Sequence, residues 1–540
     1  MIMRNIKHII SLMAIVLLMG NAQARTVEIK MSTCPKPYVE NIRKMTSGLR
    51  YNDVLILDFD KPGQYEFDGS LKFKCNTTIK GVSSKSTKVV VKEGFVNGRS
   101  KMLDDTFFAV HGSSTRKVRA EVRDISFELA SHNGILWEKA PKHIIKVCFG
   151  DGIVIDNIVA YSKNATLTHV DLRDCDNAVV SNCEFENYNN SAEGGCVWSR
   201  GAQHNIHIVN NVFRKYGKDE VLGCWGGIEE KNFEIKNVVI EENEFYLDNK
   251  TGSKILDLQN FISFNHTYTE KAKTYCTLDS IIFKNNRIII NAPIRRIFMT
   301  AFSKYAIVNN LEISNNEILC TSKGSKNDFS MNDIDIISEL ADKTNITIDN
   351  NYISSKCEVL SDGKNSGHTF LSVRNANVNV SNNIIENEYP QRLIWCHEGS
   401  LFLNLDNNRV SNMYTTTLSS SKNIDQASIT ATNNAFSGDT RVYCRNVKNL
   451  SLNYQNNVFD SSNYHFFLQE GAEQTSIIFE NNIVNAISKK GKIYANYDGK
   501  PCNFNKVTIS NNTFNGIKSN DITGPLNKAG KLQIKGNIYK

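Results

Sequence analysis

Apolar and polar residues alternate along most of this chain in short runs, and many of these runs end in a pair of asparagines. The segments VTIS and LEIS, which precede Asn511–Asn512 and Asn315–Asn316, show a period of two. An apolar residue follows two positions after each of these pairs. A period of two is typical of β-strands, whose successive side chains point to opposite faces. We therefore predict short strands on both sides of a tight turn.

The asparagine pair marks a repeat. Its second position returns after 23 to 43 residues, so a fixed unit carries insertions at one place. Asn tolerates the left-handed backbone of a tight turn, and its amide can bond to neighbouring backbone. Stacked units would place the amides above one another as a ladder. The second positions are Cys183, Asn211, Asn243, Asn286, Asn316, Asn351, Asn383, Asn408, Asn434, Asn457, Asn482, Asn512 and Asn537.

Three short strands in each unit predict a parallel β-helix, an all-β solenoid. Helical repeats would need apolar positions with a 3.6-residue period, and a propeller would need four strands in about 40 residues. From about Leu55 to the C-terminus, the pattern resembles the right-handed parallel β-helix (pectin-lyase-like) superfamily of pectate lyases, polygalacturonases and phage tailspikes. The resemblance implies a solenoid of about 13 to 15 coils, with a substrate groove along the first strand of each coil.

The resemblance concerns fold and not chemistry. The chain has no W-I-D-H element of pectate lyases and no N-T-D, G-H-G or R-I-K element of polygalacturonases. No catalytic residue is therefore carried over from a named enzyme.

Residues 1–24 have the features of a cleavable signal peptide. Arg4 and Lys7 precede an apolar stretch that is too short to span a bilayer, and Ala22-Gln23-Ala24 predicts cleavage after Ala24. No later stretch has the pattern of a membrane span. We predict a secreted or periplasmic monomer.

Two further segments follow the predicted signal peptide. Residues 25–70 are expected to form an N-terminal cap with opening strands, and residues 71–540 the β-helix. A short amphipathic helix with Tyr38, Ile42, Met45 and Leu49 on its buried face would cover the first coil. The 13 cysteines are odd in number and lack C-x-x-C spacing, so we predict buried free thiols rather than disulfides or a zinc site.

Polar residues, most of them basic, recur where the predicted first strands end. The formal net charge of +7 falls to about +5 without Arg4 and Lys7, a mild excess that matters only if it is clustered. A stripe of Arg and Lys suits a chain of carboxylates or sulfates, whereas nucleic acid would need denser charge and stacking aromatics. Ordinary solvated strand ends are the alternative. The residues are Arg173, Arg200, His266, Lys304, Glu339, Arg374, His397, Lys422 and Arg445.

The segment from Asp171 to Glu230 is the richest in candidate chemistry. Trp198 and Trp225 occupy corresponding strand positions in adjacent coils and could stack on sugar rings, with core packing as the alternative. The predicted partner is a polysaccharide, most simply an anionic one. The candidate substrate contacts are Asp171, Arg173, Trp198, Trp225, Lys304, Arg374 and His397.

Two reactions and one non-catalytic role fit these residues. In β-elimination on a uronic-acid chain, Lys218, Arg200 or His266 would be the base, and Arg173 or bound calcium would neutralise the carboxylate. In glycoside hydrolysis, two carboxylates would act across the bond, and the candidates are Asp219, Glu220, Glu193 and Asp171. A carbohydrate-binding surface protein is the third hypothesis.

Calcium is the one cofactor that the sequence suggests. The segment DLRDCD offers Asp171, Asp174 and Asp176, and carboxylate oxygens are the ligands that Ca²⁺ prefers. An Asp-rich turn without a metal is the alternative.

Overall fold

The structure is a computed structural model of the chain. It describes residues 24–96, 106–129, 143–163, 168–189, 195–217, 221–226, 233–248, 262–266, 276–291, 298–300, 306–321, 332–336, 344–356, 369–388, 391–396, 399–438, 441–461, 465–470, 474–486, 492–495, 503–516 and 531–540. The predicted signal peptide lies almost wholly outside these residues.

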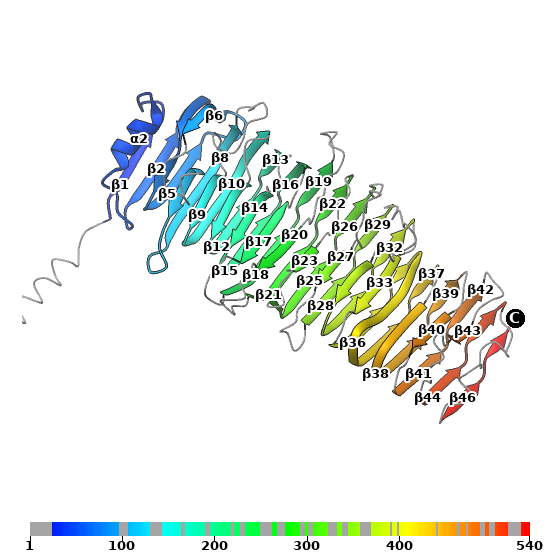
Figure 1. Ribbon diagram of the computed structural model, residues 1–540. Helices are drawn as coiled ribbons and strands as arrows, with labels where there is room; N and C mark the ends of the chain where they lie inside the picture. Colours follow the sequence, from blue (N-terminus) through cyan, green and yellow to red (C-terminus); the bar gives the residue numbers. More distant parts are fainter. Residues whose placement is uncertain are drawn as a thin grey trace, which may run out of the picture.

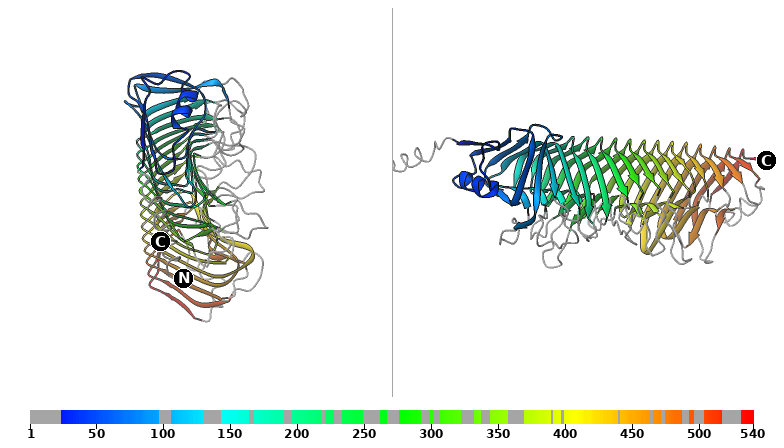
Figure 2. Two further views of the ribbon diagram at one scale, coloured as in Figure 1. Left: turned by 90° about the vertical axis from the view of Figure 1, so that its left-hand side faces the viewer. Right: turned by 90° about the horizontal axis from the view of Figure 1, so that it is seen from above.

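The chain folds into a right-handed parallel β-helix, which confirms the predicted fold class. Strands stack coil upon coil from the N-terminus to the C-terminus (Figure 1), and the solenoid is elongated in every view (Figure 2). Each coil contributes to three long parallel sheets, because a strand pairs with its equivalents in the coils before and after it: β11, for example, pairs in parallel with β9 and β14.

The first sheet precedes the second in each coil and carries the candidate site. Its strands are β4 (Leu71–Phe73), β7 (Thr106–His111), β9 (His143–Cys148), β11 (Thr168–Arg173), β14 (Gly195–Arg200), β17 (Leu222–Gly226), β20 (Ile262–His266), β23 (Phe298–Thr300), β27 (Asn332–Ile336), β30 (Thr369–Val373), β33 (Gln391–Cys396), the first parts of β36 (Met413–Thr432) and β38 (Arg441–Gln455), β40 (His465–Glu470) and β43 (Lys492–Ala495).

The second sheet ends at the asparagine turn. Its strands are β1 (Thr26–Lys30), β2 (Val54–Phe59), β5 (Asn76–Gly81), the first parts of β8 (Val118–Leu129) and β10 (Gly150–Lys163), β12 (Asp176–Ser181), β15 (Gln203–Val209), β18 (Phe233–Glu241), β21 (Cys276–Lys284), β24 (Ala306–Val308), β25 (Asn310–Ser314), β28 (Thr344–Asp349), β31 (Ala376–Ser381), β34 (Gly399–Asp406), the last parts of β36 and β38, β41 (Gln474–Glu480), β44 (Phe504–Ser510) and β46 (Leu532–Lys535).

The third sheet follows the asparagine turn. Its strands are β3 (Gly63–Gly69), β6 (Thr87–Val96), the last parts of β8 and β10, β13 (Glu184–Asn189), β16 (Val212–Gly217), β19 (Glu244–Asp248), β22 (Arg287–Ile290), β26 (Glu317–Cys320), β29 (Tyr352–Ser355), β32 (Ile384–Asn387), β35 (Arg409–Val410), β37 (Ala435–Ser437), β39 (Val458–Ser461), β42 (Ile483–Ala486), β45 (Thr513–Asn515) and β47 (Ile538–Tyr539).

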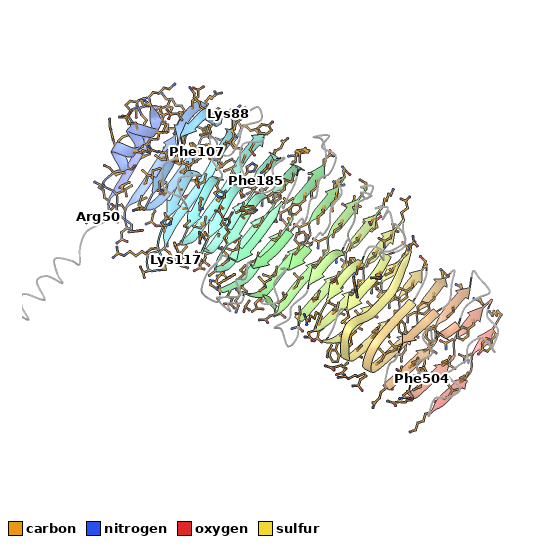
Figure 3. The ribbon with its side chains drawn as sticks, viewed as in Figure 1. Arg50, Lys88, Phe107, Lys117, Phe185 and Phe504 are labelled. Carbon is orange, nitrogen blue, oxygen red and sulfur yellow. The ribbon has the colours of Figure 1, made fainter. Side chains whose placement is uncertain are left out.

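The interior is filled by apolar side chains that stack from coil to coil. The ring centroids of Phe185 and Phe213 are 5.3 Å apart, and those of Phe213 and Phe245 are 4.9 Å apart, with nearly parallel ring planes. Figure 3 labels Phe185 within this stack of coils. The alternation of buried and half-buried residues in strands such as β2 produces this interior, because the period of two puts every second side chain inside.

The predicted asparagine ladder is present at the turn between the second and third sheets. Asn434 is typical: its Nδ2 donates to Oδ1 of Asn457 (3.0 Å) and to the backbone oxygen of Leu405 (2.9 Å). Its Oδ1 accepts from the backbone N–H and the Nδ2 of Asn408. The first asparagine of each pair has the other role, since Asn433 has a φ of 59° and forms the left-handed corner. In each asparagine pair, the first residue thus forms the left-handed turn and the second is a buried residue whose amide forms the hydrogen bonds.

A helix covers the N-terminal end, as predicted, but one of its predicted buried residues is exposed. Helix α2 (Tyr38–Thr46) buries Tyr38, Val39 and Ile42, and the Tyr38 ring lies 5.5 Å from that of Phe67. Met45 is exposed, and Leu49 lies beyond the end of the helix at Thr46, where it is partly buried against the core. The coils also begin early: β1 already pairs in parallel with β2 inside the segment predicted as the cap.

The nine cysteines whose side chains the structure describes are all buried, which fits the predicted role as small core residues. Burial raises the pKa of the Cys196 thiol to about 12, so this thiol is not ionised at neutral pH. No helix among the described residues is long and apolar enough to cross a membrane.

Replacing Asn434 with Ala should lower the free energy of unfolding by at least about 2 kcal/mol, because each buried partner left unsatisfied costs about 1–3 kcal/mol. Asn433→Gly is the matched control: Gly adopts a positive φ freely, so a change within about 0.5 kcal/mol is expected for this exposed position. Urea unfolding of both variants checks the ladder, and equal losses in the two would contradict its role.

Candidate functional site

The candidate site lies on the outer face of the first sheet, at strands β9, β11 and β14. Parallel register places Lys146, Asp171 and Trp198 in one row across these strands. Two residues further along β11 and β14, Arg173 pairs with Arg200, so these two residues lie on the same face of the sheet as the row. The strands bring together five side chains that belong to three different coils.

Asp171 is the centre of a buried ionic cluster. Its Oδ2 lies 3.2 Å from Nζ of Lys146 and 3.4 Å from Nε2 of His143, and its Oδ1 lies 3.3 Å from Nε of Arg200. Asp171 has no exposed surface, while Lys146 and His143 are nearly as buried. The Arg200 side chain is 31% exposed, so the cluster reaches solvent at this end.

The charge of Asp171 is set by two opposing effects. Burial alone would raise the pKa of Asp171, because a carboxylate is poorly solvated inside a protein. The electrostatic interactions with His143, Arg200 and Lys146 and the hydrogen bond from Lys146 outweigh this effect, so the pKa of Asp171 lies below its ordinary value. Asp171 is therefore an anion at neutral pH, which makes it an unsuitable general acid and a suitable anchor for cations.

Trp198 fixes the position of Arg200. The guanidinium carbon of Arg200 lies 4.3 Å from the centre of the Trp198 ring, a cation–π contact, and His143 meets the ring edge-on. Because Trp198 is buried and Asp171 fully so, neither presents a free surface to a ligand. In the structure both contact Arg200, and their role as substrate contacts stays a prediction from the sequence.

Arg173 is the second partly exposed cation of the site. Its side chain is 27% exposed, and its Nε lies 3.7 Å from Oδ2 of Asp174. Asp174 in turn accepts a hydrogen bond from the backbone N–H of Ala202 at 3.1 Å. Gly201 makes this possible, since it has a φ of 73° and a Cβ here would meet Oδ1 of Asp174 at 2.2 Å. The turn after β14 thus keeps the ends of β11 and β14, and both arginines, in register.

The register differs from the predicted stripe in two respects. Trp198 pairs with Gly223, and Trp225 pairs with Arg200, so the two tryptophans do not occupy corresponding positions. In the following coil, Trp225 pairs with Asn265, so His266 lies one residue beyond the row that contains Arg200 and Trp225. The prediction treated each polar strand end as equivalent, but strand lengths differ from coil to coil.

The far part of the predicted stripe is also interrupted. Arg445 pairs with Ser419 rather than Lys422, because the register shifts between Ser419 and Ile424. Arg374 is half-buried two residues after Ser372 on the first sheet. Lys218, Asp219, Glu220, Glu193, Lys304, Glu339 and His397 lie outside the described residues, as do the side chains of Trp225 and His266.

Sequence reasoning missed Lys146 and His143. They lie in the segment HIIKVC, one coil before THVDLR, and aligning these two strands would have placed Lys146 beside Asp171. The signal was weak because the coil that contains HIIKVC has no asparagine pair. A similar pair, Arg392 lying 5.0 Å from the ring centre of Trp395, occurs further along the first sheet.

The three aspartates proposed for calcium face different partners. Asp171 binds the buried cations, Asp174 accepts from Ala202, and Asp176 accepts at 2.8 Å from His204 Nδ1. Within the described residues, no group of three or more His, Cys, Asp or Glu is placed to hold a metal ion. Calcium stays a prediction from the sequence.

No protein-family model and no curated protein matches the chain. Among solved structures, the catalytic unit of a GH87 α-1,3-glucanase from Streptomyces thermodiastaticus is 12% identical, covering 93% of this chain and 69% of that one, with a TM-score of 0.38. A family 28 exopolygalacturonase from Yersinia enterocolitica is 11% identical, covering 80% and 78%, with a TM-score of 0.43.

The DFA-IIIase of Arthrobacter chlorophenolicus without its lid is 12% identical, covering 76% of this chain and 99% of that one, with a TM-score of 0.45. At these scores the similarities concern the course of the chain and carry no inference about activity.

Replacing Asp171 with Asn should lower the free energy of unfolding by about 3–5 kcal/mol at neutral pH, because it removes the anion that the buried Lys146 and the half-buried Arg200 share. Since the folded-state pKa is depressed, this contribution is complete above the unfolded value of about 3.9 and is lost as the pH falls through the folded value. The difference between variant and parent should therefore shrink below about pH 4.

Urea unfolding of both proteins across a pH series measures this difference. Asp425→Asn is the control, since Asp425 forms an exposed pair with Lys448 and should cost less than about 1 kcal/mol. A difference for Asp171→Asn that does not change with pH would refute the ionic cluster.

Proposed function

We propose that the mature chain is a secreted, monomeric protein that binds an anionic, uronic-acid-containing polysaccharide at the candidate site and cleaves it by β-elimination. The observation that carries the proposal is the pair of guanidinium groups at the ends of β11 and β14. Arg173 and Arg200 are neighbours in register, both partly exposed, and Arg200 is held from beneath by Asp171 and Trp198.

Two adjacent guanidiniums suit a carboxylate ligand. Each presents N–H groups in a planar fork that matches the two oxygens of a carboxylate. Arg200 is held in place before any ligand arrives, so little conformational freedom would be lost on binding. Among the described side chains of the cluster, the cations Lys146, Arg173 and Arg200 outnumber the anions Asp171 and Asp174, which favours an anionic chain over a neutral one.

In the proposed reaction, the arginines neutralise the carboxylate of the uronate residue. This makes the proton on the adjacent carbon more acidic and stabilises the enolate-like intermediate after a base removes that proton. The electron pair then forms a carbon–carbon double bond, the bond to the glycosidic oxygen breaks, and this oxygen takes up a proton. Lys218 and His266 are the proposed bases, and Arg200 acts on the carboxylate.

Hydrolysis, the alternative reaction, would need a carboxylate pair that does not include Asp171. It needs two carboxylates across the scissile bond, one of them protonated. Asp171 is fully buried, ionised and surrounded by cations, so it does not fit either role. Glu193, Asp219 and Glu220 would have to provide the pair if the chain is a hydrolase.

The test is to incubate the mature protein with uronic-acid, sulfated and neutral polysaccharides, with and without calcium. Ultraviolet absorbance detects the unsaturated uronate of a lyase, and reducing ends detect any cleavage. Growth of both signals on a uronic-acid polymer is the expected result. Reducing ends without absorbance would show a hydrolase, and neither signal on any polymer would favour the binding protein.

Arg200→Ala should reduce the rate of β-elimination by about 100-fold or more, as expected for the loss of a group that stabilises developing charge. Arg200→Lys should recover part of the rate, because it restores the charge without the planar fork. Arg409→Ala removes an exposed arginine from β35 on the third sheet and should leave the rate unchanged. Equal effects of the Arg200 and Arg409 variants would refute the assignment.

A further inference from the structure

A second surface of the molecule has the features of a ligand site. The outer face of the second sheet contains a shallow groove of about 440 Å³ across β28, β31, β34 and β36. Its polar and aromatic lining comes mainly from Asn345, Asn377, Asn379, Phe402, Asn404 and Thr430. All lie in the described residues, and none belongs to the candidate site on the first sheet.

Register arranges these side chains in two parallel rows. Asn345, Asn377 and Phe402 pair in succession across β28, β31 and β34. Thr347, Asn379, Asn404 and Thr430 form the neighbouring row, which continues into β36. Because neighbouring parallel strands lie about 4.8 Å apart, the rows present polar groups at a regular spacing along the solenoid axis.

The amides of the two rows are fixed by hydrogen bonds to one another. Nδ2 of Asn377 donates to Oδ1 of Asn345 at 2.9 Å, and Nδ2 of Asn404 donates to Oδ1 of Asn379 at 2.8 Å. A side-chain amide has two N–H donors and an oxygen with two lone pairs. Asn377 and Asn404 use one donor each in these bonds, and Asn345 and Asn379 use one acceptor position each, so every amide can still donate to and accept from a ligand.

The charge of this surface differs from that of the candidate site. None of the lining residues is charged. Asp349 and Asp406 lie two residues further along β28 and β34, at the border of the groove, and their carboxylates accept hydrogen bonds from Ser381 and Thr432. An anionic chain would meet these negative groups, and none of the residues that line the groove carries a positive charge, so the charges favour a neutral ligand.

We propose that this groove binds a neutral oligosaccharide. Sugar hydroxyls both donate and accept hydrogen bonds, which matches the oriented amides and the Thr430 hydroxyl, while the apolar face of a sugar ring matches the half-buried ring of Phe402. The site lies on a different sheet from Arg173 and Arg200, so it does not rest on the proposed lyase activity. It would hold a neutral part of a glycan while the first sheet contacts a charged part.

The test is to titrate the mature protein with neutral cello- and xylo-oligosaccharides and with an oligogalacturonate, using isothermal titration calorimetry. At least one neutral oligosaccharide should bind. Phe402→Ala should weaken this binding at least tenfold, and Thr430→Val, which keeps the shape of a β-branched residue, should weaken it several-fold. Tyr352→Ala removes an exposed aromatic ring from β29 on the third sheet and should have no effect.

The outcomes separate this proposal from the proposed function. Binding of oligogalacturonate should respond to Arg200→Ala and not to Phe402→Ala, whereas binding of the neutral ligand should show the reverse. Failure of every neutral oligosaccharide to bind would overturn the groove proposal, as would binding that Phe402→Ala and Thr430→Val leave unchanged. Loss of self-association in Phe402→Ala, measured by sedimentation, would instead identify the groove as a contact between copies.

Discussion

The structure depends on one recurring interaction, the buried hydrogen bonds of the asparagine ladder. A parallel β-helix must turn its backbone sharply in each coil, and each turn would bury N–H and C=O groups away from water. The ladder residues from Asn211 to Asn512 satisfy these groups, since each amide donates to a backbone oxygen of the preceding coil and to the ladder asparagine of the next coil. The left-handed residue before each ladder position makes the corner sharp enough to bring the amides into line.

This constraint leaves the outer faces of the sheets free to differ. Inside the solenoid, the period of two and the ladder demand apolar residues and asparagine. Outside, the first sheet carries the charged cluster around Asp171, while the second sheet carries uncharged amides and Phe402. Strand register determines these outer rows as strictly as it determines the core. A shift of one residue would move every outward-facing side chain of a strand to the inside and every inward-facing one to the outside.

The fold could be predicted because the ladder residues are visible in the sequence, whereas the site could be predicted only in part. Arg173 and Arg200 were identified from their place at strand ends, and Asp171 from the segment rich in candidate chemistry. The roles of Asp171 and Trp198 depended on burial, which the period of two does not give when both faces of a strand are covered. Lys146 was missed because its coil has no asparagine pair. Trp225 was misaligned because neighbouring strands differ in length.

In the proposed function, Arg173 and Arg200 together recognise the carboxylate of a uronate. The most direct test is to measure the affinity of the protein for oligogalacturonate, oligomannuronate and a hyaluronan oligosaccharide, each compared with its methyl ester. The ester has nearly the same shape and lacks the charge. We expect at least one acid form to bind ten times more tightly than its ester or better, and equal affinities for every pair would contradict the account.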